Sequence, residues 1–214
     1  PFPPLDLMVH IGEISAASFN DTIPAKEVWR VSEDGELRDP FKKLTTVFQM
    51  SEEMFFLHYG KDGCNRHVLI DECRELFGEI YEQIPELPFC NIWTAMQLSS
   101  RLPKGALFHM GVSNTRRCWN MFQLPESVES ACNVGCCGID GCVSTLVGAS
   151  LVNPDRLCYV VVGDLTFFYD LNSLGNHHIG TNLRVMLVNN GRGTEFRLGI
   201  HHCNVFGDDA DKYM

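Results

Sequence analysis

Apolar and polar positions follow one another along the chain in blocks that predict strands and helices in turn. Two short unbroken apolar runs, at residues 159–162 and 185–188, stop at Gly163 and Asn189, and a helix-like segment lies between them. Strands that are buried on both faces have this pattern, and a helical crossover between two such strands makes them parallel. The stretch 160–196 therefore predicts a strand, a helix and a second, parallel strand.

The same alternation precedes this stretch. Helical spacing of apolar residues, or a strand-like run, marks the segments 73–84, 91–102, 106–110 and 144–150. The resulting order is helix, strand, loop, helix, strand, helix, strand, which is typical of a parallel sheet wrapped by helices. We therefore expect an α/β fold over residues 61–214, with helices on both faces of a parallel sheet.

The first sixty residues predict part of a second α/β domain. Strand-like runs lie at 5–11, 27–31 and 45–48. Ser51 follows them and can cap a short helix that carries acids in its first turn. Because the sequence begins in a strand, we interpret residues 1–60 as the C-terminal remnant of a central domain. The polar segment 60–63 is the expected linker.

Composition narrows the class of protein. The chain has 214 residues, of which 45% are hydrophobic and 21% charged, so it can bury a core. A net charge of −10, with no cluster of Lys and Arg, argues against binding to nucleic acid or to an anionic membrane. No apolar run approaches the ~20 residues of a membrane span, and the start lacks the basic region of a signal peptide. We expect a cytoplasmic protein.

The ten cysteines are expected to be reduced thiols, because a chain of this size and apolar content does not need disulfides. Some of them cluster at Cys132, Cys136, Cys137 and Cys142. Their spacing is not that of a standard zinc site, so small side chains beside a tight loop are favoured, with metal ligation as the alternative. The histidine pairs 177–178 and 201–202 are expected at the surface or in loops, since adjacent side chains point apart.

Polar groups follow two of the predicted strands at the point where each ends. Asp164 comes directly after Gly163, and Asn190 follows the next strand. The carboxyl ends of parallel strands meet at one edge of the sheet, where open α/β folds bind ligands. Carboxylate and amide oxygens suit Mg²⁺ that carries a phosphate ester. The alternative is an ordinary Asp cap and an Asn turn.

Three glycine-containing loops, at 111–114, 135–141 and 189–193, should converge at the same edge. Glycines let backbone N–H groups approach a diphosphate, and the start of a helix after such a loop favours an anion. Glycine loops alone are weak evidence, because any turn between a strand and a helix uses them. Their combination with the Gly-Asp and Asn-Asn pairs is more specific.

The Gly-Asp and Asn-Asn pairs resemble the signature by which thiamine-diphosphate-dependent enzymes hold Mg²⁺ and the diphosphate of the cofactor. The segments 163–172 (GDLTFFYDLN) and 138–145 (GIDGCVST) resemble one branch more closely, the 2-succinyl-5-enolpyruvyl-6-hydroxy-3-cyclohexene-1-carboxylate synthases of the menaquinone pathway. The similarity extends more weakly to residues 38–40 and so covers most of the chain. It implies the α/β thiamine-diphosphate-binding fold.

The resemblance implies roles for individual positions. Mg²⁺ would be held by Asp164, by the Asn190 side chain and by the backbone carbonyl of Arg192, which stands where the family commonly has glycine. Ile139 would wedge beneath the cofactor and bend it into a V shape. The positions that would bind the cofactor are Gly138, Ile139, Asp140, Gly163, Asp164, Leu165 and Asn190. The implied reaction decarboxylates a small 2-oxo acid and joins the product to an acceptor.

Positions for the substrate match the family less well. Ser113 and Arg117 fit a Ser and Arg pair, so Arg117 is the candidate for binding a substrate carboxylate, with a plain surface charge as the alternative. The family's Asn is Val112 here, its Arg in an Asn-Arg-Gly sequence is Val134, and an apolar residue near the roof of the active site is Glu195. The loss of an arginine and the gain of an acid disfavour a polyanionic pair of substrates. We therefore expect a relative that acts on a different acceptor.

In this family the catalytic glutamate comes from a pyrimidine-binding domain on a partner subunit, and no glutamate of this chain lies in a matching motif. We assign no catalytic residue and expect an inactive fragment, truncated at its C-terminus, of a parent homodimer or homotetramer. A non-catalytic α/β module that binds a nucleotide or a partner is the alternative from another class. A nicotinamide-dependent dehydrogenase is disfavoured, because no Gly-x-Gly-x-x-Gly follows a first strand.

Overall fold

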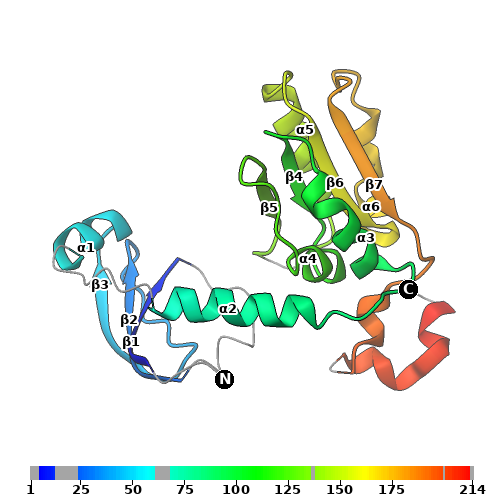
Figure 1. The fold of residues 1–214 in the computed structure, drawn as a ribbon. Coiled ribbons are helices and arrows are strands. Elements are labelled where there is room, and N and C mark those ends of the chain that lie inside the picture. The colour runs from blue at the N-terminus through cyan, green and yellow to red at the C-terminus, as the bar shows by residue number, and fades with distance from the viewer. Residues whose placement is uncertain (1–4, 13–23, 61–67, 136–137, 200, 213–214) are drawn as a thin grey trace. The chain divides into compact units, whose positions relative to one another are not determined.

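The computed structural model describes residues 5–12, 24–60, 68–135, 138–199 and 201–212 (Figure 1). The chain forms two compact units, here called unit 1 (Pro1–Ile84) and unit 2 (Pro85–Met214). Both units are built on parallel sheets with helices packed around them. The predicted α/β fold is therefore confirmed. The linker expected at 60–63 lies almost entirely outside the described residues, and the boundary drawn there stays a prediction.

Unit 1 contains a parallel sheet in the order β1-β2-β3. Its elements are β1 (Leu5–Ile11), β2 (Ala25–Ser32), β3 (Leu44–Gln49), α1 (Glu52–Tyr59) and α2 (Val68–Glu82). The three strands and α1 lie where the sequence predicts them. Ser51 is the N-cap of α1, and its hydroxyl accepts a hydrogen bond from the N–H of Met54 at 3.3 Å. The core of unit 1 is formed by Val28 and Val31 of β2 and by Phe55 of α1.

The helix α2 is longer than predicted, and most of its surface is exposed to solvent. It begins at Val68 rather than at residue 73, and its side chains from residue 70 to residue 82 are exposed. Exposed hydrophobic side chains on it include Ile70, Leu76, Phe77, Ile80 and Tyr81. None of the helices in the described ranges combines the length and the apolar character that a membrane crossing requires.

Unit 2 contains the larger parallel sheet, in the order β5-β4-β6-β7. Its strands are β4 (Leu107–Met110), β5 (Glu129–Cys132), β6 (Cys158–Gly163) and β7 (Leu183–Val188). The α-helices are α3 (Asn91–Leu98), α4 (Asn114–Trp119), α5 (Cys142–Val152) and α6 (Asp164–Tyr169). Short 3₁₀ helices are η2 (Ser99–Arg101), η3 (Leu171–Gly175), η4 (Thr194–Arg197) and η5 (His202–Lys212).

Helices cover both faces of this sheet. On one face, α5 packs its buried residues against Val160 and Val162 of β6. On the other face, Phe108 of β4 packs against Trp119 of α4, with ring centroids 4.7 Å apart. Successive side chains of a strand point to opposite faces, so one apolar strand can supply both layers. This explains why the central strands consist of unbroken apolar runs.

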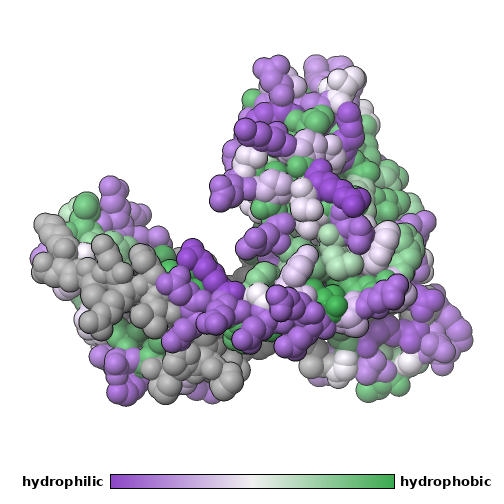
Figure 2. Space-filling model, in the orientation of Figure 1, coloured by the Kyte–Doolittle hydropathy of each residue, from purple (hydrophilic) through white to green (hydrophobic). Residues whose placement is uncertain are grey.

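The strands β6 and β7, which α6 connects, pair in parallel as predicted, with Val160 opposite Val185. The sequence did not predict β5 or α4. At the other end of the sheet from β5, β7 pairs with β6 alone in the described residues. Hydrophobic surface gathers along β7 and α6 (Figure 2), where Phe168, Tyr169 and Leu187 are exposed.

Candidate functional site

The ends of β6 and β7 meet through the side chain of Asp164. This residue begins α6 directly after β6 and is buried, with 7% of its surface exposed. Its Oδ1 accepts a hydrogen bond from the N–H of Leu165 at 2.8 Å, and its Oδ2 accepts one from the N–H of Gly191 at 2.6 Å. The carboxylate thus fixes the loop that follows β7 to the end of β6.

The loop after β7 turns at Gly191, whose φ of +69° favours glycine. The turn brings the N–H of Arg192 to the side-chain oxygen of Asn190 at 3.3 Å. The carbonyl of Arg192 accepts a hydrogen bond from Thr194 at 3.1 Å. A carbonyl oxygen has two lone pairs, so one hydrogen bond does not by itself exclude a cation as a second partner.

These oxygens suit a metal ion that brings further ligands with it. Among the described residues, no group of three or more His, Cys, Asp or Glu is placed to hold a metal. Asp164 contributes a carboxylate at the junction of the β6 and β7 ends, and the loop after β7 contributes amide and backbone oxygens. Mg²⁺ is commonly bound in this way, by one or two carboxylates together with water and the phosphates of a ligand. The residues present therefore fit Mg²⁺ carried by a diphosphate.

The glycine loop before α5 is placed from residue 138 onward, since Cys136 and Cys137 lie outside the described residues. Gly138 and Ile139 are half-buried and Asp140 is exposed. A Cβ atom at Gly138 would lie 2.5 Å from Oδ1 of Asp140, so a larger residue here would require the exposed Asp140 side chain to move. Gly141 is the N-cap of α5 at φ +79°, and the loop ends there.

Asp170, to which the sequence analysis gave no role, binds a backbone N–H at the start of α5 through its carboxylate. Oδ2 of Asp170 accepts a hydrogen bond from the N–H of Ser144 at 2.7 Å. This N–H belongs to the first turn of α5, which the sequence led us to expect near the diphosphate. An internal acid therefore satisfies one of the donors there. The position of Asp170 within the segment 163–172 is the signal that could have identified it.

Asn133 is a second residue that the sequence did not identify. Its Nδ2 donates to the carbonyl of Gly141 at 3.2 Å and to Oγ1 of Thr145 at 3.1 Å. It also hydrogen-bonds to the side chain of His109. Asn133 thus links β4, the loop after β5 and the start of α5, and so positions the glycine loop.

His109 is buried in the sheet, with 3% of its surface exposed, and its Nε2 has no hydrogen-bond partner in the structure. Burial lowers the pKa of His109, and the hydrogen bond with Asn133 opposes this effect. The imidazole is therefore neutral in the folded chain near pH 7.

This leads to a prediction about stability. As the pH falls through about 6.5, the ordinary pKa of His, the unfolded chain binds the proton first. The free energy of unfolding should therefore decrease below that pH, until the lower pKa of the folded state is passed. Urea unfolding at several pH values should show this decrease, and His109→Gln should weaken it. The same substitution at the exposed His177 should leave it unchanged, and equal effects of both would contradict the prediction.

Ser113 is the N-cap of α4 and Arg117 lies in its last turn, and both contact Glu195 of η4. Nη1 of Arg117 donates to Oε2 of Glu195 at 2.6 Å, and Nη2 donates to Oε1 at 3.2 Å. The Ser113 hydroxyl also donates a hydrogen bond to Glu195. The candidate substrate residues are therefore brought together, and Glu195 is their common partner.

In the described part of the chain, the two histidine pairs lie at the surface or in loops and the cysteines are free thiols. His177 and His178 are exposed after η3. His201 lies against Phe196, and its Nδ1 accepts a hydrogen bond from the N–H of Cys203 at 3.1 Å. Cys142 is a fully buried free thiol, and burial raises its pKa.

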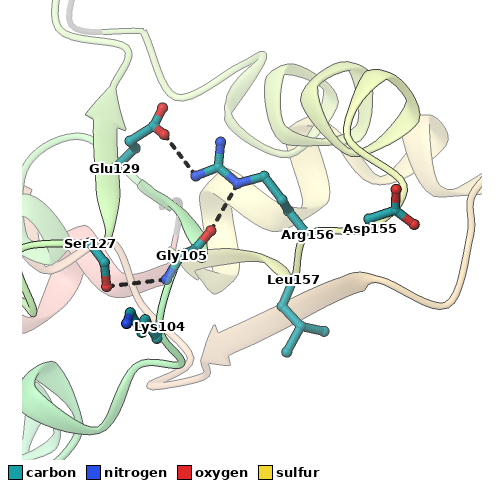
Figure 3. Close-up of a pocket in the computed structure, with 7 residues that line it drawn as sticks. All are labelled: Lys104, Gly105, Ser127, Glu129, Asp155, Arg156 and Leu157. Atoms are coloured by element: carbon teal, nitrogen blue, oxygen red, sulfur yellow. Dashed lines mark hydrogen bonds and ion pairs between the residues drawn. The ribbon is translucent and has the colours of Figure 1, made fainter.

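A hollow of about 510 Å³ lies at the opposite edge of the same sheet, before the strands begin (Figure 3). Arg156 reaches into it, but its Nη2 pairs with Glu129 at 2.9 Å and its Nε donates to the carbonyl of Gly105 at 2.8 Å. The guanidinium is thus largely committed to the protein. Ligands of open α/β sheets bind at the carboxyl edge, which is the other edge.

Comparison with known proteins places the chain beside one group of synthases. The chain is 38% identical over 179 residues to the 2-succinyl-5-enolpyruvyl-6-hydroxy-3-cyclohexene-1-carboxylate synthase of Bacteroides fragilis, and 37% identical over 175 residues to that of Bacteroides thetaiotaomicron. Identity to the Flavobacterium psychrophilum synthase is 33% over 172 residues. These matches cover 81%, 81% and 76% of the chain but only 31% of each relative. No family model matches the chain. The resemblance to these synthases is confirmed.

Proposed function

We propose that this chain is the diphosphate-binding part of a thiamine-diphosphate- and Mg²⁺-dependent enzyme, which decarboxylates a 2-oxo acid and joins the product to an acceptor. The observation that carries the proposal is the buried carboxylate of Asp164, which joins the carboxyl ends of two parallel strands. The similarity to synthases supports it. Because the chain spans 31% of their length, the activity of a whole protein is part of the proposal.

In this proposal the chain binds and orients the tail of the cofactor. Mg²⁺ would be held by Asp164, by Asn190 and by the carbonyl of Arg192. The backbone around Gly138, Asp140, Gly163 and Leu165 would receive the diphosphate, and Ile139 would support the cofactor from below. When bound, thiamine diphosphate supplies the carbon nucleophile that attacks the 2-oxo acid.

The chain's own residues do not complete this chemistry. We assign it no catalytic residue and propose that the 214 residues alone do not turn over. A pyrimidine-binding domain, supplied by a parent homodimer or homotetramer in the cytoplasm, would complete the site. In this proposal residues 1–60 belong to a preceding domain and residues 61–214 to the cofactor domain.

The acceptor is proposed to differ from that of the synthases. Val134 is half-buried at a position where the resemblance implies an arginine, and Glu195 adds an acid. Both changes make the site less favourable for two polyanionic substrates. Ser113 and Arg117 remain as the proposed substrate-binding pair.

Calorimetric titration of the 214-residue chain tests the proposal. With Mg²⁺ present, thiamine diphosphate should bind at least about tenfold more tightly than after removal of Mg²⁺ with EDTA, a difference of about 1.4 kcal/mol. Thiamine monophosphate should lose a similar factor, because it lacks the second phosphate that Mg²⁺ would help to hold. Adenosine diphosphate serves as the comparison ligand. If it binds as tightly as thiamine diphosphate, the chain is a general nucleotide-binding module and the proposal is wrong.

A further inference from the structure

Glu195 and Arg117 form an ion pair at the carboxyl edge of the sheet in unit 2. Two nitrogens of the guanidinium face the two oxygens of the carboxylate, at 2.6 Å and 3.2 Å. This two-pronged arrangement is the one by which arginine recognises a carboxylate group. The side chains are 48% and 34% exposed, so a ligand from solvent can reach the pair.

Further contacts hold the pair in this geometry. Nη1 of Arg117 also lies 3.3 Å from the hydroxyl of Ser113 and 3.2 Å from Oδ1 of Asn114. Nδ2 of Asn114 donates to Oγ1 of Thr194 at 2.9 Å, which makes a second link between α4 and η4. Ser113 has a φ of +71°, which is uncommon for residues other than glycine. The pair therefore belongs to a small network that joins the two segments.

We infer that Glu195 is a specificity-determining residue, which fills with its own carboxylate the place where Arg117 would receive a carboxylate of the substrate. The inference rests on the proposed function, since it takes Arg117 as part of the substrate site. A second carboxylate at this place must displace Glu195 or lie beside it, and like charges at such distances repel. The subsite therefore admits a neutral or hydrogen-bonding group of the substrate and rejects an acidic one.

Glu195 would disfavour an acidic substrate group in two ways: it occupies nitrogens of Arg117, and its negative charge repels a second carboxylate. Glu195 occupies the edge of the Arg117 guanidinium formed by Nη1 and Nη2, and a second carboxylate at the Nε edge would lie close to the same negative charge. A neutral carbonyl or hydroxyl can still accept a bond from a remaining N–H of Arg117 without approaching a like charge. Conversion of Glu195 to glutamine keeps its shape but removes the repulsion. The variant Glu195→Gln should therefore open the subsite to carboxylates.

Titration with succinate, followed through the backbone ¹H–¹⁵N signals of α4 and η4, tests this inference. Glu195→Gln should bind succinate about tenfold or more tightly than the natural chain. The matched control is Glu129→Gln, which removes the same charge from another Arg–Glu pair, with Arg156, at the opposite edge. The control should bind succinate as the natural chain does. The double variant Glu195→Gln with Arg117→Gln should lose the gain.

If Glu195→Gln gains no affinity, whether the natural chain binds succinate well or not at all, the inference is wrong. An equal gain in Glu129→Gln would mean that net charge alone is responsible, which also overturns it. Titration of the same samples with Mg²⁺ and thiamine diphosphate separates the two proposals. Intact cofactor binding without the succinate gain removes only the role of Glu195. A succinate gain without cofactor binding removes the proposed function and, with it, the substrate role of Arg117, and leaves only the competition between Glu195 and a bound carboxylate.

Discussion

Replacement of Asp164 by asparagine should lower the Mg²⁺-dependent affinity of the chain for thiamine diphosphate by about a hundredfold or more. The substitution removes the negative charge that Asp164 brings to the proposed ion site, and Mg²⁺ depends strongly on charged oxygen ligands. Even residues that only orient metal ligands typically change affinity 10- to 100-fold when they are mutated. Calorimetry with and without Mg²⁺ measures the effect directly.

Asparagine at this position should also disturb the loop after β7. Both oxygens of Asp164 accept a backbone hydrogen bond, from Leu165 and from Gly191. An amide has one oxygen, so in either orientation its NH₂ group faces an N–H donor. We expect a cost of about 1–3 kcal/mol in the free energy of unfolding. Faster hydrogen exchange at Gly191 should accompany it.

The matched control for this variant is Asp155→Asn. Asp155 is exposed beside the hollow at the opposite edge of the sheet, so the substitution makes the same change of charge away from the site. It should leave both cofactor affinity and stability unchanged. If Asp164→Asn retains the Mg²⁺ dependence of the natural chain, Asp164 is not a metal ligand and the proposed site is wrong.

The meeting of the β6 and β7 ends could be predicted from the sequence, because it follows from local patterns. Unbroken apolar runs at 159–162 and 185–188 indicated buried parallel strands, and parallel strands bring their carboxyl ends to one edge. The side chains that end those runs had to lie near each other. For the same reason the three strands of unit 1 and the cap at Ser51 were found from the sequence.

Contacts between distant segments could not be predicted in this way. The fold brings together segments that are distant in the sequence. Only for this reason does Asp170 bind the N–H of Ser144, and Arg117 pair with Glu195. The sequence singled out Glu195 as a residue of interest, but it could not show that Glu195 pairs with Arg117. The strand β5 was missed because ESAC has no apolar run, and pairing with β4 is what makes it a strand.

Replacement of Asn182 by alanine should lower the free energy of unfolding of unit 2 by about 2–4 kcal/mol. Asn182 is 9% exposed and lies just before β7. Its Nδ2 donates to the carbonyls of Ser150, Asn153 and Arg156 at 3.0–3.1 Å. These carbonyls lie at the end of α5 and in the turn that leads to β6. Alanine leaves them without this donor in a largely buried place.

The control for this variant is at the same end of α5. Asn153→Ala makes the same substitution, but Nδ2 of Asn153 donates to one carbonyl, that of Ala149, at 2.9 Å. It should cost about 0.5–1.5 kcal/mol, the typical contribution of one hydrogen bond. Urea unfolding gives both values, and hydrogen exchange of peptides from α5 and β7 assigns them to unit 2.

Asn182→Asp distinguishes the loss of the donor from the loss of the side chain. Aspartate has nearly the shape of asparagine, but it presents acceptor oxygens and a charge to three carbonyl oxygens. It should therefore destabilise unit 2 more than alanine does, and the difference should shrink at low pH as the carboxyl group binds a proton. If aspartate costs less than alanine at pH 7, packing rather than donation explains the role of Asn182.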